Sequence, residues 1–170
     1  NITRAEAINC KSKIVEAMEK RGVFALPSLL FIDFQKIIDS FASNGLLNHN
    51  ANTRTISFSH QSFLDYFIVS DTMNKIYLGY NLKDMIGDLD EQTPVVRYRV
   101  VSILQNLIDS DQGTFVEQSL KLLDSDSVRF YFKCTVFEII GQCESPEKRI
   151  LNISDTYSRK EEWSDYITQV

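Results

Sequence analysis

Two histidines, His49 and His60, are the side chains in this sequence whose charge can change near neutral pH. His60 stands between a short alternating run, Thr55-Ile56-Ser57-Phe58, and a long aromatic helical pattern that begins at Gln61. A helix N-terminus presents free amides and the positive end of the helix dipole, and an imidazole adds one hydrogen-bond donor. His60 is therefore predicted to suit a phosphate group. The alternative is that its ring caps backbone groups or packs under the preceding strands.

Sequence patterns that support catalysis in other proteins are missing. The chain contains neither a Gly-x-x-x-x-Gly-Lys-Ser/Thr phosphate loop nor a Gly-x-Gly-x-x-Gly turn, so no ATPase site is expected in it. With two histidines and no Cys-x-x-Cys pair, no metal site is expected either. No nucleophile, base and orienting acid can be nominated. We therefore predict no catalytic residues and a chain that is not an enzyme.

The three cysteines, Cys10, Cys134 and Cys143, are an odd number without close pairing. This pattern favours reduced thiols over a disulfide framework, and hence a cytoplasmic location. No run of residues is long and apolar enough to span a bilayer and none resembles a secretion signal, so no membrane partner is expected. The carboxylate pairs Glu16/Glu19 and Asp124/Asp126 are expected to be ordinary exposed carboxylates.

The elements that would position His60 can be predicted from local signals. Thr3-Arg4-Ala5-Glu6 is a capping box that begins a helix, and Lys20-Arg21-Gly22 ends it. The further expected elements are an extended segment at 23–26, a short helix at 28–32, a helix capped by Asp33 and ended at Asn44-Gly45, a hairpin over 46–58 with its turn at 49–52, and a long helix over 61–78. Helix, strand, two helices and a hairpin are the winged-helix order. Residues 1–80 are therefore predicted to form a winged-helix domain, with Phe63, Tyr66 and Phe67 as packing residues between it and the next domain.

Residues 81–170 show helical periodicity only. Helices are predicted at 82–88, 94–109, 113–123, 127–142, 147–156 and 160–170. The segments Val96-Arg97-Tyr98 and Val128-Arg129-Phe130 are offset by 32 residues, and apolar positions that follow them align at the same offset. A repeat of this length predicts a HEAT-like α-solenoid module. Two unrelated amphipathic helices could also match at this offset. The expected fold class is mostly α.

The pattern Phe58-x-His60-x-Ser62-Phe63-x-x-Tyr66-Phe67, preceded by Gly45-Leu46-Leu47 and a hairpin, resembles the winged-helix domain of NACHT-type STAND ATPases. This group contains NOD-like receptors and many bacterial defence proteins. The resemblance covers about residues 23–70. From residue 81 onward it rests on helical content and order alone.

The resemblance implies that His60 contacts the β-phosphate of ADP in a closed, inactive state. The ADP or ATP would be held by a nucleotide-binding domain of the same polypeptide, which is outside this sequence, and no cofactor is expected in the chain itself. The helical part would couple closure to sensing or to protein ligands. Because the chain begins with Asn1 and its last residues still have a helical pattern, it is expected to be part of a longer protein.

Charge bears on two alternative functions. Residues 1–80 hold 8 Lys/Arg and 7 Asp/Glu, whereas residues 81–170 hold 10 and 16. In a DNA-binding winged helix, the helix that begins at Asp33 would be the recognition helix. It carries one positive charge, Lys36, and two negative charges, Asp33 and Asp39, and the hairpin adds only Arg54. A DNA-binding winged helix is therefore disfavoured. A stand-alone helical scaffold that binds proteins, with the N-terminal half as its cap, stays open as an alternative.

Overall fold

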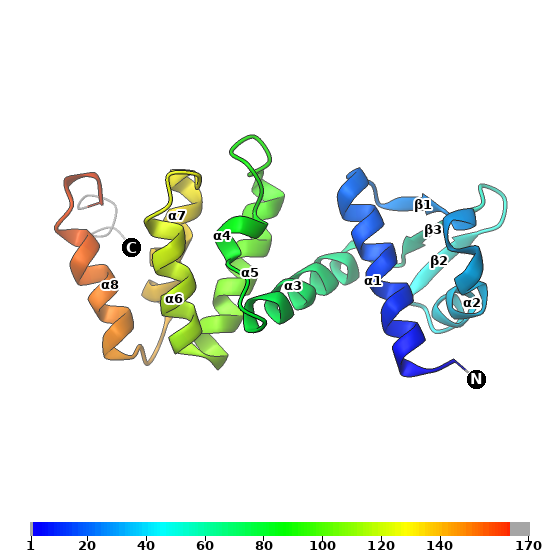
Figure 1. The fold of residues 1–170 in the computed structure, drawn as a ribbon, viewed down its shortest axis with the longest axis horizontal. Coiled ribbons are helices and arrows are strands. Elements are labelled where there is room, and N and C mark those ends of the chain that lie inside the picture. Colours follow the sequence, from blue (N-terminus) through cyan, green and yellow to red (C-terminus); the bar gives the residue numbers. More distant parts are fainter. Residues whose placement is uncertain (1, 164–170) are drawn as a thin grey trace. The chain divides into compact units, whose positions relative to one another are not determined.

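The computed structural model describes residues 2–163 and is mostly α-helical, with one small antiparallel sheet (Figure 1). The chain divides into two compact units, Asn1–Ile68 (unit 1) and Val69–Val170 (unit 2), each with its own hydrophobic core. The division falls within helix α3, Gln61–Tyr77, and not after Tyr80 as the sequence predicted. The reason is that Leu64 and Ile68 pack in the core of unit 1, whereas Ile76 packs in that of unit 2.

Unit 1 begins with α1, Arg4–Arg21, and its predicted capping box is confirmed. The backbone amide of Glu6 donates to Thr3 Oγ1 at 3.2 Å, and the amide of Thr3 donates to Glu6 Oε2 at 2.8 Å. At the other end, Gly22 adopts a left-handed conformation with φ 61°, which glycine accepts without steric cost. The buried stripe of α1 is Cys10, Ile14, Val15 and Met18. Ile8 lies about 120° around the helix from Ile14 and is exposed.

After α1 the chain forms β1, Ala25–Pro27, the 3-10 helix η1, Ser28–Phe34, and α2, Gln35–Ser43. Asp33 does not cap α2, which corrects the sequence prediction. It lies inside η1, after a kink at Phe31, and this last part of η1 runs into α2 with no side-chain cap. Ile37 and Ile38 of α2 are buried, and Phe31 of η1 joins them in the core.

The predicted hairpin is present as β2, Leu47–Asn50, and β3, Thr55–Phe58. β3 is the central strand of an antiparallel sheet of order β1-β3-β2, in which Leu26 pairs with Ile56 and Leu47 pairs with Phe58. The side chains of these four residues are buried on one face of the sheet, which agrees with the alternation expected for a half-covered sheet. The turn spans 51–54, so His49 lies on β2 and not in the turn.

Unit 2 continues with α4, Leu82–Met85, α5, Pro94–Ser110, α6, Gln112–Leu123, α7, Phe130–Gln142, and α8, Lys148–Ser158. Each corresponds to a predicted helix. α4 is shorter than predicted, and it is followed by Gly87 in a left-handed conformation with φ 81°. Most of the helix predicted at 160–170 lies outside the described residues.

The helices of unit 2 are arranged in two layers. α5 and α7 are neighbours in one layer, while α6 lies between α4 and α8 in the other (Figure 1). The positions that align at the offset of 32 residues are buried in both α5 and α7: Val100 with Phe132, Leu104 with Val136, Leu107 with Ile139, and Ile108 with Ile140. Both helices therefore bury the same positions against the other layer.

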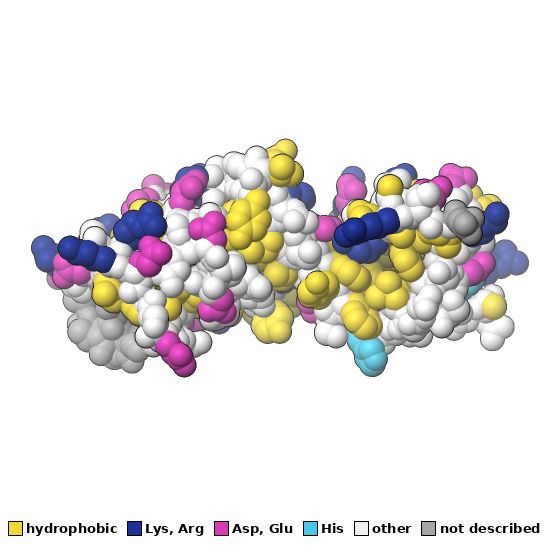
Figure 2. Space-filling model, turned by 90° about the horizontal axis from the view of Figure 1, so that it is seen from below, with side chains coloured by type: hydrophobic (Ala, Val, Ile, Leu, Met, Phe, Trp, Pro, Cys, Tyr) yellow, Lys and Arg dark blue, Asp and Glu magenta, His cyan; other side chains and the backbone are white. Residues whose placement is uncertain are grey.

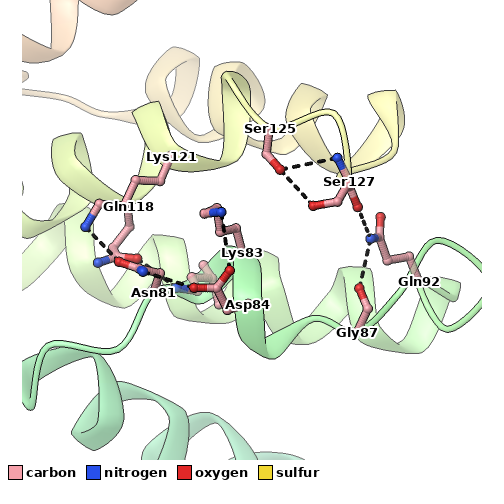
Figure 3. A network of polar contacts seen from close by, with 10 residues as sticks. Asn81, Lys83, Asp84, Gly87, Gln92, Gln118, Lys121, Ser125 and Ser127 are labelled. Atoms are coloured by element: carbon pink, nitrogen blue, oxygen red, sulfur yellow. Dashed lines mark hydrogen bonds and ion pairs between the residues drawn. The ribbon is translucent and has the colours of Figure 1, made fainter.

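Polar side chains join successive helix pairs of unit 2 across 33 to 41 residues of sequence. Figure 3 shows the contacts around Asn81, Gln118 and Lys121. In the layer that contains α6, the backbone amide of Leu82 donates to the buried Gln118 at 2.8 Å, and the Tyr157 hydroxyl donates to Asp124. In the other layer, Arg97 donates two hydrogen bonds to the carboxylate of Glu138. Asp124 is exposed, as the sequence predicted, and it also accepts this hydrogen bond from Tyr157.

Candidate functional site

The junction between β3 and α3 is held in place by Ser59. Its hydroxyl donates to the carbonyl of Gly45 at 2.5 Å and to that of Leu46 at 3.1 Å, and its amide donates to the Leu46 carbonyl at 3.0 Å. These bonds tie the end of β3 to the turn between α2 and β2. His60 follows at once, and its carbonyl accepts from the amide of Phe63 at 3.1 Å. The position of His60 is therefore set by the hairpin on one side and by the first turn of α3 on the other.

The imidazole of His60 is exposed. Its ring centroid lies 5.9 Å from that of Phe63, at an interplanar angle of 58°, so one face of the ring is next to an aromatic side chain of α3. Helix α3 begins at Gln61, and the amides of a first helical turn have no carbonyl partner within their helix. An exposed imidazole beside such a turn can donate a hydrogen bond to an anion that approaches from solvent.

A hollow of about 280 Å³ lies next to this junction, lined by Phe24, Ser57, Phe58, Gln61 and Leu64. Its wall is mixed: Phe24, Phe58 and Leu64 supply apolar side chains, and the Ser57 hydroxyl and the Gln61 amide supply hydrogen-bonding groups. Phe24 is 58% exposed and precedes β1, so it adds an aromatic ring at the surface. Sequence reasoning missed Phe24, because only the pairing of β1 with β3 brings its segment beside this junction. It also gave no role to Ser57, Ser59 and Gln61, although they lie within three residues of His60 in the sequence.

The aromatic residues of α3 take different positions. Phe63 and Phe67 pack against the core of unit 1, and the Lys11 ammonium of α1 lies 4.7 Å from the centroid of the Phe67 ring. Tyr66 is 65% exposed and does not belong to that core, which corrects its prediction as a packing residue. On the face drawn in Figure 2, hydrophobic side chains of unit 1 gather at the surface with Lys and Arg side chains at their margin.

The other residues singled out for chemistry are not brought into this site. His49 lines a separate hollow of about 520 Å³ with Ala42, Leu47 and their neighbours. Within residues 2–163, no group of three or more His, Cys, Asp or Glu side chains could hold a metal ion. The three cysteines are free thiols, of which Cys10 and Cys134 are buried and Cys143 is half-buried. In the same part of the chain, no helix combines the length and the apolar character needed to cross a membrane.

Burial raises the pKa of the Cys10 thiol to about 11 from an ordinary value of 9.0. The folded state therefore disfavours the thiolate, and the unfolded state loses this proton first as the pH rises. Below about pH 9 the contribution of Cys10 to stability is complete and should amount to about 2 kcal/mol. This contribution is lost as the pH rises from about 9 to about 11.

The free energy of urea unfolding, followed by circular dichroism across this range, should fall more steeply for the wild type than for Cys10→Ala. Cys143→Ala is the control and should keep the wild-type slope. Equal slopes for the wild type and Cys10→Ala would contradict the prediction.

No family model, curated protein or solved structure matches this chain.

Proposed function

We propose that the chain is a regulatory, non-catalytic part of a NACHT-type STAND signalling ATPase. In this proposal unit 1 is a winged-helix domain and unit 2 is a HEAT-like helical module. The order of elements supports the first assignment, since α1, β1, η1 with α2, and the β2–β3 hairpin follow one another as in a winged helix, with β1 paired to β3. The two layers of unit 2 and its offset of 32 residues support the second.

The observation that carries the proposal is the exposed ring of His60 at the start of α3, directly after a β-hairpin. In the inactive state, unit 1 would close on ADP held by the nucleotide-binding domain of the same polypeptide, and His60 would donate a hydrogen bond to the β-phosphate. Exchange of ADP for ATP would remove this contact and shift the population toward an open, active arrangement. A role in bacterial defence is part of the same proposal, as is a cytoplasmic location. ADP or ATP belongs to the parent protein, and no cofactor is assigned to this chain.

Replacing His60 by alanine in the full-length parent protein tests the role directly. A hydrogen bond to a charged group contributes about 1.5–3 kcal/mol, so His60→Ala should release ADP about 10- to 100-fold faster. The measurement is the ADP that stays bound after gel filtration, together with the release rate of a fluorescent ADP analogue. His49→Ala is the matched control, because His49 is an exposed histidine of the same hairpin. ADP retention unchanged by His60→Ala would refute the proposed contact.

A second candidate function is a protein-binding scaffold formed by unit 2. This function is favoured by several large apolar side chains that are exposed on the loops and helix ends of the stack of α4 to α8. This function is compatible with the first, because the helical part of a signalling ATPase could bind a protein ligand. A DNA-binding winged helix is not proposed: α2 carries Lys36 against Asp39, and unit 1 holds 7 Lys/Arg and 6 Asp/Glu in all.

A further inference from the structure

Two loops of unit 2, residues 86–93 and 124–129, form one edge of the helical stack (Figure 1). Gln92 joins them. Its Nε2 donates to the Ser127 carbonyl at 2.6 Å (Figure 3). Its Oε1 accepts from the amide of Arg129 at 2.8 Å. Arg129 Nε also donates to the carbonyl of Leu89 at 2.5 Å. Because each loop is bonded to the other, this edge is a preformed surface that a partner need not order on binding.

Large apolar side chains are exposed at this edge. Leu89 is 47% exposed, Val95 52%, Tyr98 63% and Phe130 48%. Tyr98 and Phe130 occupy equivalent positions of the repeat, on the neighbouring helices α5 and α7, so they lie on the same side of the stack. Single apolar residues are normal at a surface, whereas exposed apolar residues that gather beside preformed loops can form a protein interaction site.

Carboxylates surround these apolar residues. Asp88, Asp90, Glu91 and Asp126 are exposed in the two loops, and Arg129 is the one basic residue in their sequence. Within the part of the chain that the structure describes, neither Asp90 nor Asp126 forms an ion pair. Unit 2 as a whole holds 11 Lys/Arg and 17 Asp/Glu. A partner that covers the apolar residues must therefore present positive charge around its own apolar side chains.

We propose that this acidic-apolar edge, formed by residues 86–93, 124–129, Val95, Tyr98 and Phe130, binds a basic amphipathic peptide segment of a partner protein. Leu89, Val95 and Tyr98 would cover its apolar side chains, while Asp90 and Asp126 would face its Lys and Arg residues. The proposal deepens the scaffold function of unit 2, on which it rests, and it does not depend on His60. Peptide binding and ADP retention can therefore fail separately.

The test measures binding of three fluorescent peptides to the full chain by anisotropy. One peptide has Leu and Lys in an amphipathic helical pattern, the second replaces each Lys by Glu, and the third replaces each Leu by Ser. Only the Leu–Lys peptide should bind well, because it alone combines both required features. Its affinity should fall as salt is raised, since exposed charges are screened beyond about 10 Å at 0.1 M ionic strength.

Variants then locate the site. Asp90→Asn combined with Asp126→Asn should weaken binding of the Leu–Lys peptide about fivefold at low salt, since exposed ion pairs contribute up to about 1 kcal/mol each. Asp109→Asn combined with Glu144→Gln removes the same charge at the opposite edge, where Asp109 lies in the last turn of α5 and Glu144 follows α7. This pair should change the affinity less than about twofold. Leu89→Ser should weaken binding about threefold or more. Leu151→Ser, at a leucine of α8 with 51% exposure, should leave it unchanged.

Three results would overturn the proposal. They are no binding of the Leu–Lys peptide, equal binding of the Leu–Glu peptide, and equal losses for the paired variants at the two edges. The last result would mean that the peptide responds to the net charge of unit 2 and not to this edge.

Discussion

Replacing Phe115 by alanine is expected to lower the free energy of unfolding of unit 2 by about 3–5 kcal/mol. Phe115 lies in the first turn of α6, its side chain is fully buried, and it belongs to the core shared by α4 to α8. Truncation removes the transfer free energy of a phenyl ring and leaves a cavity that the surrounding helices close only in part. The core of unit 1 contains none of the residues that pack with Phe115, so unit 1 should be much less affected.

The single tryptophan makes this prediction measurable by unit. Trp163 is buried in the core of unit 2. The centroid of its ring lies 4.5 Å from the centroid of the Phe130 ring and 5.0 Å from that of the Phe137 ring. Urea unfolding followed by tryptophan fluorescence therefore reports unit 2, while circular dichroism reports both units. Tyr98→Ala is the control for loss of an aromatic ring and should change stability by about 0.5 kcal/mol or less, because Tyr98 is largely exposed. A loss below about 1 kcal/mol for Phe115→Ala, or equal shifts in both units, would contradict two separate cores.

Local sequence signals predicted most elements of the fold, because the interactions that define them span few residues. The capping box of Thr3 and Glu6, the left-handed stop at Gly22 and the alternation of Thr55 to Phe58 all act within about four residues of the chain. The amphipathic helices of unit 2 were predicted for the same reason, since each apolar face is visible within its own segment.

Features that depend on distant segments could not be predicted in the same way. Asp33 is a good helix cap by residue type, yet η1 already makes its surroundings helical. Tyr66 has the spacing of a core residue, and the packing of α3 leaves it exposed. The division of the chain within α3 depends on which core covers each half of the helix, and the sequence of α3 is apolar on both sides of Ile68. Long-range packing decides each of these cases.

The candidate site shows the same limit. His60 was identified because a histidine between a strand and a helix is visible in the sequence, and the structure places it after a hairpin with an exposed ring. Ser59, which fixes this junction, bonds to carbonyls 13 and 14 residues away. Phe24 reaches the adjoining hollow from the segment before β1. Only a three-dimensional arrangement reveals that Phe24, Ser57 and Gln61 line one hollow.

Gln92→Ala is expected to lower the free energy of unfolding of unit 2 by about 3 kcal/mol. The side chain of Gln92 is 2% exposed, and its amide makes hydrogen bonds to Gly87, Ser127 and Arg129. Its removal breaks these bonds and leaves buried polar groups of the two loops without their partner, which costs more than the loss of an exposed hydrogen bond. Gln105→Ala is the matched control, since Gln105 bonds only to the nearby Asp109 carboxylate at 3.3 Å and should contribute less than about 1 kcal/mol. Equal losses for the two glutamine variants in urea unfolding would contradict the role assigned to Gln92.

Comparison with Phe115→Ala separates stability from the shape of the acidic-apolar edge. Both substitutions destabilise unit 2 by several kcal/mol, but Phe115 lies at the start of α6, at the opposite edge from the loops that Gln92 joins. Under conditions where both variants stay folded, Phe115→Ala should keep the wild-type affinity for the Leu–Lys peptide. Gln92→Ala should lose affinity and should be cut faster by protease within residues 86–93, because the two loops are no longer held together. If both variants bound the peptide equally well, the preformed edge would not be what the peptide recognises.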